Sequence, residues 1–329
     1  MRLIGLAVIV SIGLIATGRL ADGQERRPGS ALVGFLATGS LSIPKSAYVF
    51  RIFRESLSGL GYVEGQNLAI AYRGAAGRPE DLPRLAAELI SLKPDVMVVT
   101  GPASIRAVRG SLTSVPVVAI DLESNPVASG FVASLAHPGG NLTGVFLDHA
   151  ALSGKWLQLL KEIVAKLGRA AVLWDPANAS PQLDAINIGA RALSIQLQPI
   201  EVRSAHSLEA AFEAATKGRA QAVVVLSAPA FSNDSPRLAH VALTSRLPTI
   251  TPFKEFAVAG GILAYGPDED SNYRRLASLV DKILRGGRPS DIPVERPTRF
   301  NLVVNLKTAR ALGLTIPQSV LFRADEIVQ

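Results

Sequence analysis

The segment Asp95–Ile120 reads DVMVVTGPASIRAVRGSLTSVPVVAI, and the segment Ala220–Pro252 reads AQAVVVLSAPAFSNDSPRLAHVALTSRLPTITP. Each opens with a short β-branched apolar run, breaks at small residues and proline, continues as a helix-like stretch and closes on a second apolar run. Such runs are typical of parallel strands buried on both faces, and the stretch between them is typical of a crossover helix. The repeated pattern therefore predicts an α/β protein of two similar Rossmann-like lobes with parallel sheets, joined by a hinge.

The ends of the predicted strands are where we expect a ligand, because open α/β sheets bind ligands beyond the carboxyl ends of their strands. The strand Leu32–Leu36 ends in Ala37-Thr38-Gly39-Ser40, and the strand Ala170–Trp174 ends in Asp175-Pro176-Ala177-Asn178-Ala179-Ser180. Local helix capping is the alternative role for Asp175, Asn178 and Ser180. Two lobes that face each other place these strand ends around one cleft.

Three local predictions concern helices. Thr100-Gly101-Pro102-Ala103-Ser104 follows a strand and opens a helix, whose free backbone N–H groups suit an anion; an ordinary strand-to-helix turn is the alternative. Pro126–Ala136 is predicted to be a short helix. Asn272–Leu284 is predicted to be a helix capped by Asp268 or Ser271.

The composition excludes several classes of protein. The chain has 329 residues, 48% of them hydrophobic and 19% charged, so it can build a large core. The formal net charge is +7, but Lys and Arg are scattered without interleaved aromatics, so we expect no nucleic-acid partner. There is no cysteine, which excludes disulfides, thiol catalysis and a lipid anchor on an N-terminal cysteine.

The first residues are typical of a secretory signal. Met1-Arg2 precedes the apolar run Leu3–Ala16, which small residues follow. A membrane anchor is the alternative, but the run is shorter than the roughly 20 apolar residues of a full span. We predict a signal peptide over residues 1–23, cleaved after Gly23 or after Ala21, and a protein located in the periplasm.

No catalytic or metal-binding motif stands out in the sequence. A phosphate loop, a dinucleotide fingerprint and a G-x-S-x-G elbow are absent, and the four histidines have no metal-ligand spacing. Asp121, Asp175 and Glu255 are single carboxylates in loops. We therefore expect a protein that is not an enzyme, with no metal and no cofactor.

Four aromatic residues lie at or near predicted strand ends in the second half of the chain: Phe231, Phe253, Phe256 and Tyr265. Stacking on a flat or apolar ligand is one role for them, and core packing is the other. We expect one or two of the four to contact a ligand.

Several blocks of sequence resemble a known family. VGFLATGS, GYVEGQNLAIAYR, RLAAELISLKPDVMVVTGPAS and SLAHPGGNLTGV are similar to segments of the ABC-transporter substrate-binding proteins of the tryptophan/tyrosine type. So are LSGKWLQLLKE, AVLWDPAN, FAVAGGILAYGPD and NLVVNLKTARALGLTIPQSVLFRADEI. The resemblance covers roughly residues 31–327 and is specific through the number and order of its blocks.

The resemblance implies a type I periplasmic-binding-protein fold with two lobes, three crossovers and a ligand in the hinge cleft. We expect lobe 1 to span residues 31–145 with a return segment 266–290. Lobe 2 is expected to span residues 146–265 with a C-terminal segment 291–329. The implied partners are a small-molecule ligand and a permease and an ATPase encoded separately, and we expect a monomer.

Carried over residue by residue, the resemblance assigns ligand binding to Gly39, Ser40, Thr100, Gly101, Ala103, Ser104, Ser124, Asn125, Asn178, Ala179, Phe231 and Phe253. One departure matters. Many relatives read Gly-Asp-Pro where this chain has Ser124-Asn125-Pro126. A neutral amide cannot pair with a ligand ammonium as a carboxylate does. Either Asp121 or Glu123 substitutes, or the ligand is not a simple amino acid.

Three rival functions remain open from the sequence. They are a sensory module that presents ligand to a membrane receptor, an exported enzyme on the same lobes, and the effector domain of a transcription factor. The last would need a DNA-reading helix pair at the N-terminus, where this chain has an export signal. For the ligand, the basic chain and weakly charged strand ends favour a small carboxylate with an apolar or aromatic body.

Overall fold

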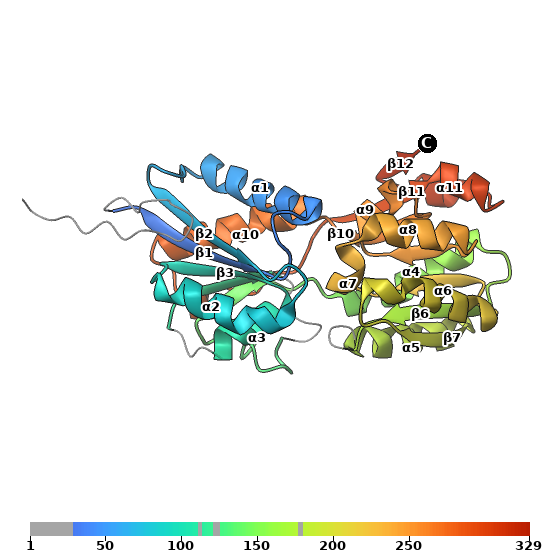
Figure 1. Cartoon of the computed structure of the whole chain (residues 1–329), viewed down its shortest axis with the longest axis horizontal. Helices are drawn as coiled ribbons and strands as arrows, with labels where there is room; N and C mark the ends of the chain where they lie inside the picture. Colours follow the sequence, from blue (N-terminus) through green and yellow to red (C-terminus); the bar gives the residue numbers. More distant parts are fainter. Residues whose placement is uncertain (1–28, 111–113, 121–125, 177–179) are drawn as a thin grey trace, which may run out of the picture.

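The molecule consists of two α/β lobes that lie side by side (Figure 1). A computed structural model describes residues 29–110, 114–120, 126–176 and 180–329. Residues 1–23, predicted to be the signal peptide, fall outside this range. Within the described residues, no helix is long and apolar enough to cross a membrane.

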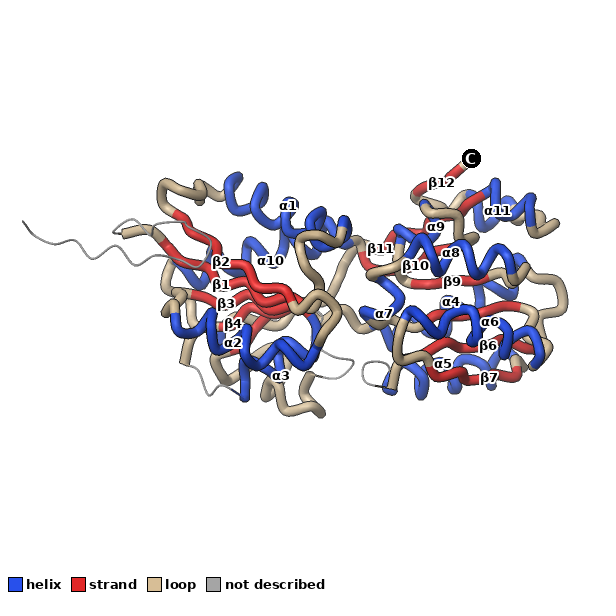
Figure 2. Tube along the Cα trace, in the orientation of Figure 1, coloured by secondary structure: helices blue, strands red, loops and turns tan. Residues whose placement is uncertain are grey.

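Lobe 1 is built on a five-stranded parallel sheet with the strand order β2-β1-β3-β4-β5. The strands are β1 (Ala31–Ala37), β2 (Leu68–Gly74), β3 (Val96–Thr100), β4 (Val117–Ile120) and β5 (Leu142–Val145). Apolar side chains fill both faces of this sheet, which explains why its strands read as continuous apolar runs. Helices cover one face with α1 (Pro44–Gly59) and α10 (Glu269–Leu284), and the other with α2 (Leu82–Ser91) and α3 (Gly101–Gly110) (Figure 2).

Lobe 2 is built on a seven-stranded sheet with the order β12-β11-β10-β9-β8-β6-β7. The strands β11 and β12 are parallel to each other and antiparallel to the other five. The strands are β6 (Arg169–Trp174), β7 (Gln196–Glu201), β8 (Ala222–Val225), β9 (Thr249–Thr251), β10 (Leu263–Pro267), β11 (Phe300–Asn305) and β12 (Glu326–Val328). One face carries α4 (His149–Ile163) and α5 (Ser180–Leu193), and the other carries α6 (Leu208–Lys217), α8 (Ser235–Thr244) and α9 (Lys254–Val258). Shorter helices are α7 (Pro229–Ser232), α11 (Leu306–Ala311) and α12 (Gln318–Leu321).

The two lobes repeat one topology. Counted from the first strand of each lobe, β1 to β5 and β6 to β10 both follow the order second, first, third, fourth, fifth. The two repeated sequence segments form the third strand, the following helices and the fourth strand of their lobes. The predicted fold class, two α/β lobes with parallel sheets, is therefore confirmed.

Three chain segments cross between the lobes, and hydrogen bonds join them into one hinge. The first follows β5, the second lies at Asp268 between β10 and α10, and the third leads into β11. The Phe146 N–H donates to the Glu295 carbonyl at 2.8 Å, and the Asp268 N–H donates to the Arg299 carbonyl at 3.0 Å. Ile292 and Val294 still pack in the core of lobe 1, whereas the sequence placed the start of the C-terminal segment of lobe 2 at residue 291.

Two local helix predictions have different outcomes. The Asp268 carboxylate accepts a hydrogen bond from the Ser271 N–H at 2.7 Å, so Asp268 is the cap of α10. The predicted helix Pro126–Ala136 is wrong, because this stretch forms turns. Phe131 and Val132 both donate their N–H groups to the Pro126 carbonyl, and Gly130 takes a positive φ of 67°, which closes a compact turn in place of a helix.

Candidate functional site

A pocket of about 170 Å³ lies between the lobes, at the carboxyl ends of the strands. This is roughly ten times the space that one water molecule needs. Its walls include Thr38 and Gly39 after β1, Thr100 at the end of β3, Gly101 at the start of α3, and Ser227 after β8. In each lobe the strand order reverses between the first and third strands, and this reversal is where α/β sheets bind ligands.

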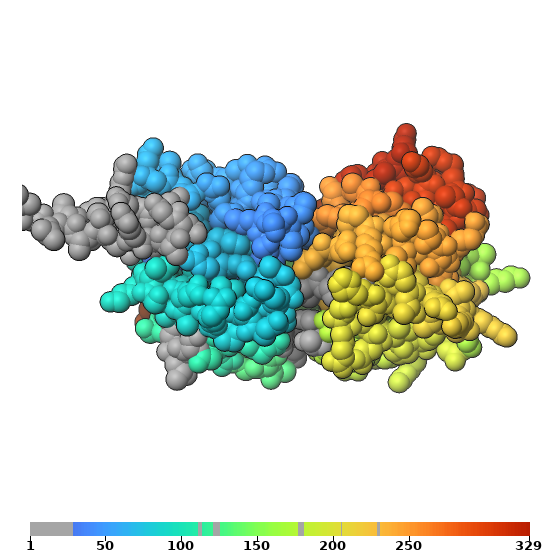
Figure 3. All heavy atoms as spheres, viewed as in Figure 1, coloured from blue at the N-terminus to red at the C-terminus, as the bar shows by residue number. Residues whose placement is uncertain are grey.

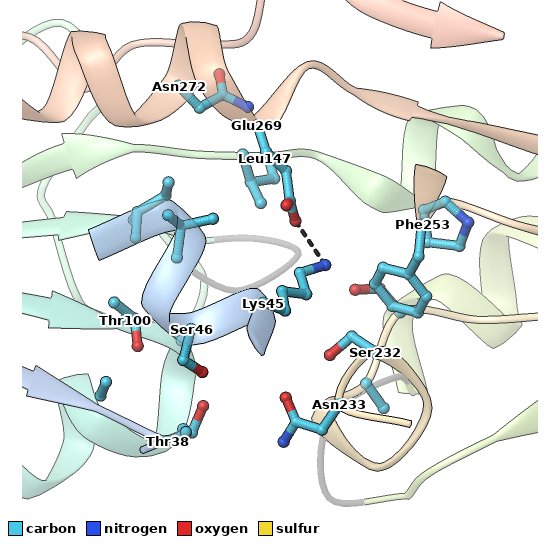
Figure 4. Close-up of a pocket in the computed structure, with 18 of the residues that line it drawn as sticks. Thr38, Lys45, Ser46, Thr100, Leu147, Ser232, Asn233, Phe253, Glu269 and Asn272 are labelled. Atoms are coloured by element: carbon cyan, nitrogen blue, oxygen red, sulfur yellow. Dashed lines mark ion pairs between the residues drawn. The ribbon is translucent and has the colours of Figure 1, made fainter. Parts of the chain in front are cut away.

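Polar side chains from both lobes reach this pocket without a partner among the described residues. They are Thr38, Ser46 and Thr100 from lobe 1, Ser227, Ser232 and Asn233 from lobe 2, and Asn272 from α10. Within the described ranges, none of these hydroxyl and amide groups makes a side-chain hydrogen bond. Figure 4 shows six of them gathered around the same space. A ligand with several hydrogen-bonding groups would satisfy donors and acceptors that the protein itself leaves open.

The residues predicted to bind ligand fall into three groups. Five line the pocket: Gly39, Thr100, Gly101, Ala103 and Phe253. Three lie elsewhere, namely Ser40, Ser104 and Phe231. Ser40 pairs with the Ser42 hydroxyl at 2.5 Å, and Ser104 is fully buried inside lobe 1. Ser124, Asn125, Asn178 and Ala179 are outside the described residues, as are Asp121 and Glu123.

Of the four aromatic residues near strand ends, Phe253 lines the pocket. Phe231 and Phe256 are fully buried in the core of lobe 2, where they fill the space between its sheet and helices. Tyr265 stacks on Phe300 with ring centroids 6.1 Å apart. Core packing therefore accounts for three of the four.

The strand end at Gly39 depends on close packing. A Cβ atom at this position would lie 2.2 Å from the Ser46 hydroxyl, so a larger residue at position 39 would force the Ser46 hydroxyl to turn away. The Tyr72 hydroxyl donates a hydrogen bond to the Gly39 carbonyl at 3.0 Å. Burial raises the pKa of Tyr72 to about 12, so the phenol stays protonated and keeps donating.

A charge cluster at the pocket joins the lobes through Lys45. The Lys45 ammonium, in the first turn of α1, lies 2.7 Å from the carboxylate of Glu269 on α10 and 3.4 Å from that of Glu255 in lobe 2. It also lies 4.8 Å from the centre of the Phe253 ring. Figure 4 shows the ion pair with Glu269, and Figure 3 shows the two lobes meeting beside α1.

The pKa values of Lys45 and Glu269 are both raised, for different reasons. Burial alone would lower the pKa of Lys45, but the carboxylates of Glu269 and Glu255 outweigh burial and raise it, so Lys45 stays charged. Burial raises the pKa of Glu269, and Glu255 raises it further, while Lys45 opposes both. The positive charge of Lys45 thus offsets the repulsion between the neighbouring carboxylates of Glu255 and Glu269.

Gln182 fixes the strand end after β8. Its side chain is 3% exposed. Its amide donates to the Ser227 carbonyl at 3.1 Å and accepts from the Ser227 N–H at 2.9 Å. Both residues line the pocket, so this two-point contact shapes the lobe 2 wall.

Sequence reasoning missed Lys45, Glu269, Asn272 and Gln182, all of which line the pocket. One signal was available for Lys45. It follows Pro44 in the first turn of a helix that has no acidic residue there. A lysine at a helix N-terminus is electrostatically unfavourable, and such exceptions are concentrated at functional sites.

The described residues contain no group of three or more His, Asp or Glu side chains placed to hold a metal ion. The lining combines open hydroxyl and amide groups, one aromatic ring from lobe 2 and an ion-paired lysine. Such an arrangement suits the reversible binding of a small polar molecule.

Comparison with known proteins agrees with this geometry. A family model described as "ABC transporter substrate binding protein" matches residues 44–328. The "Tyrosine-binding protein" of Clostridioides difficile is 22% identical over 264 residues, covering 80% of this chain and 75% of that protein.

Two solved structures are similar in fold, each with a TM-score of 0.83 over 91% of this chain. A conserved domain protein from Vibrio cholerae is 23% identical and covered over 99% of its length. An ABC domain from Streptococcus pneumonia in complex with L-Trp is 20% identical and covered over its full length. Because the family model spans most of the sequence, the chain belongs to the family of ABC transporter substrate-binding proteins and has the type I periplasmic-binding-protein fold.

Proposed function

We propose that this protein is exported to the periplasm and captures a small molecule between its lobes for delivery to an ABC importer. One observation supports this most strongly. The interlobe pocket collects hydroxyl and amide groups from both lobes that have no partner among the described residues. A ligand that contacts both walls at once stabilises the arrangement in which the lobes are close together.

The proposed mechanism is closure about the three crossovers. A ligand shifts an equilibrium between open and closed lobes only by its difference in affinity for the two states. The groups after β1 and β3 are on one lobe and those after β8 and β9 are on the other, so both sets contact one ligand only when the lobes are close. No bond is made or broken, and the protein is proposed to work as a monomer without catalytic activity.

The ligand is proposed to be an amino acid or another small molecule with an apolar or aromatic body. The relatives named for tyrosine and crystallised with L-Trp support this class. Phe253 offers an aromatic wall for such a body. The proposed partners are a permease and an ATPase encoded separately.

A thermal-shift screen tests this function. The exported protein is heated with amino acids, aromatic acids, amines, purines and short peptides. A ligand that binds only the folded state adds about 2.7 kcal/mol of stability at 100 times its dissociation constant. We expect one chemical class to raise the melting temperature, with unaltered compound recovered afterwards. A flat response from a folded, ligand-free protein, or turnover of the bound compound, would contradict the proposal.

Replacing Gln182 by leucine should weaken ligand binding about tenfold, since two hydrogen bonds of about 1 kcal/mol each hold the Ser227 backbone in place. Leucine has a similar volume, so the change removes the polar contacts and largely keeps the packing. Isothermal titration of the best ligand from the screen gives the dissociation constant.

The matched control is Gln221→Leu. The Gln221 amide oxygen also accepts two backbone N–H groups, from Gly168 and Arg169 at 2.8 and 3.0 Å. Gln221 lies just before β8, at the amino ends of the strands, whereas the pocket lies at their carboxyl ends. We expect this variant to keep its affinity within about twofold. Equal losses in both variants would show that Gln182 acts through global stability alone.

A further inference from the structure

The charge cluster at the pocket has an excess of negative charge. Lys45 supplies one positive charge, while Glu255 and Glu269 supply two negative charges, so the formal sum is −1. The neighbouring cation Lys254 is already paired with Glu326 at 2.6 Å. On the other side of the pocket, Asp148 faces Arg296 at 3.7 Å. Among the described charged groups around the pocket, the excess negative charge therefore lies in the Lys45 cluster, in which Lys45 and Glu269 line the pocket and Glu255 lies behind them.

Asn272 provides a second, independent observation at the same corner. It lies three residues after Glu269 on α10, a spacing that puts both side chains on one face of the helix. Its side chain is buried, with the residue 5% exposed, and lines the pocket. Among the described residues, the side-chain amide of Asn272 has no hydrogen-bond partner. Figure 4 shows Glu269 extending from this helix toward Lys45, with Asn272 on the same helix.

Resting on the proposed function, we propose that the pocket selects a ligand with a positively charged nitrogen, which binds between the Glu269 carboxylate and the Asn272 amide oxygen. Both groups accept hydrogen bonds, as an ammonium or amidinium requires. With such a ligand bound, Lys45 stays on Glu255 and the cluster holds two cations and two carboxylates. A ligand whose only charge is a carboxylate meets the uncompensated negative charge instead.

Glu269 supplies a carboxylate from the hinge side of the pocket. The ligand class is then a cationic nitrogen on an apolar or aromatic body, and it includes zwitterionic amino acids and amines.

Matched compound sets test the charge preference directly. One set is L-tyrosine, tyramine and 3-(4-hydroxyphenyl)propionate, and others are built in the same way on tryptophan, phenylalanine, leucine and valine. Within each set the body is constant, while the ammonium or the carboxylate is removed. For every set that binds, we expect the members with an ammonium to bind at least about tenfold tighter than the member without one, as for a desolvated charge pair.

Glu269→Gln should reduce the preference for the ammonium-bearing compounds to within about threefold. Asn272→Leu should lower the affinity for the ammonium-bearing compounds and leave the affinity for the others unchanged. Asp270→Asn is the control, because it makes the same charge change one residue further along α10. Asp270 contacts Tyr48 and Arg274 and is not part of the pocket wall. It should keep the wild-type preference. All variants are first compared by circular dichroism and by melting temperature without ligand.

The outcomes separate this inference from the proposed function. Tight binding of the member without an ammonium, or an unchanged preference in Glu269→Gln, overturns the inference and leaves the binding function standing. Binding of no member of any set, by a folded protein freed of carried-over ligand, overturns this inference, and the proposed function falls with it only if the whole thermal-shift panel is also flat.

Discussion

Replacing Lys45 by methionine is expected to separate the two lobes in the ligand-free protein. Methionine keeps an unbranched apolar side chain beside Phe253 but removes the charge. The carboxylates of Glu255 and Glu269 then face each other across the lobes without a cation. Removing one partner of a fully buried pair costs about 3–5 kcal/mol. Both carboxylates here are about one third exposed, at 36% and 35%, so solvent screening reduces the expected cost to about 1–2 kcal/mol.

A cost of this size changes the ratio of closed to open lobes by roughly tenfold. Small-angle X-ray scattering measures it as a larger radius of gyration without ligand. Lys254→Met is the matched control, because Lys254 pairs with Glu326 inside lobe 2. It should keep the wild-type radius, and so should the double variant Lys45→Met/Glu255→Gln, which removes the repulsion. An unchanged radius in Lys45→Met would show that the ion pair has no part in holding the lobes together.

The pH dependence of Lys45→Met gives a second check. In the wild type, burial and Glu255 already raise the pKa of Glu269, and Lys45 opposes this shift. Without Lys45 the pKa of Glu269 rises further. A carboxyl with a raised pKa takes up its proton at higher pH, and the neutral form is not repelled by Glu255. The radius of the variant should therefore decrease as the pH falls from 8 to 5, and it should change less in the wild type.

The fold could be predicted because its main signal is local. Val96–Val99 and Ala222–Val225 are apolar throughout, and a strand that is apolar on both faces must lie inside a sheet covered by helices on both sides. The helix predicted over Pro126–Ala136 was wrong because Gly130, four residues after Pro126, takes a positive φ that closes a turn there.

The pocket could be predicted only in part. Strand ends such as Gly39 and Thr100 follow from the strands themselves, because topology brings the carboxyl ends of neighbouring parallel strands together. Lys45, Glu255 and Glu269 are far apart in the sequence and lie among 34 Lys and Arg and 27 Asp and Glu residues. Their proximity depends on where α10 returns to lobe 1 and where α9 meets the hinge, which periodicity does not specify.

Replacing Gly144 by alanine is expected to destabilise lobe 1 strongly, although it adds only one methyl group. Gly144 pairs with Ala119 on the neighbouring strand β4 and has a φ of +152°. A Cβ atom here would lie 1.9 Å from the Ala119 carbonyl oxygen. Overpacking costs about 1–3 kcal/mol. A backbone conformation that only glycine adopts easily costs about another 1–3 kcal/mol. We expect the free energy of unfolding to fall by about 2–6 kcal/mol.

The same substitution at Gly154 is the control. Gly154 lies inside α4, and a Cβ atom there meets no atom within 4 Å. Alanine in a helix interior is favoured over glycine by about 0.5–1 kcal/mol, so this variant should be slightly more stable than the wild type. Urea unfolding followed by far-UV circular dichroism measures both variants. A Gly144→Ala protein within about 0.5 kcal/mol of the wild type would show that β4 and β5 separate at little cost.

The position of Gly144 also links this packing to binding. Its carbonyl accepts the Glu295 N–H at 2.9 Å, so β5 is held between β4 and the third crossover. Three and four residues further along, Leu147 and Asp148 line the pocket from the first crossover. A methyl group that pushes β5 away from β4 therefore displaces two of the three crossovers together with one wall of the site. The affinity of Gly144→Ala for ligand should fall even at temperatures where the variant is fully folded, whereas a loss that only tracks unfolding would place the effect in stability alone.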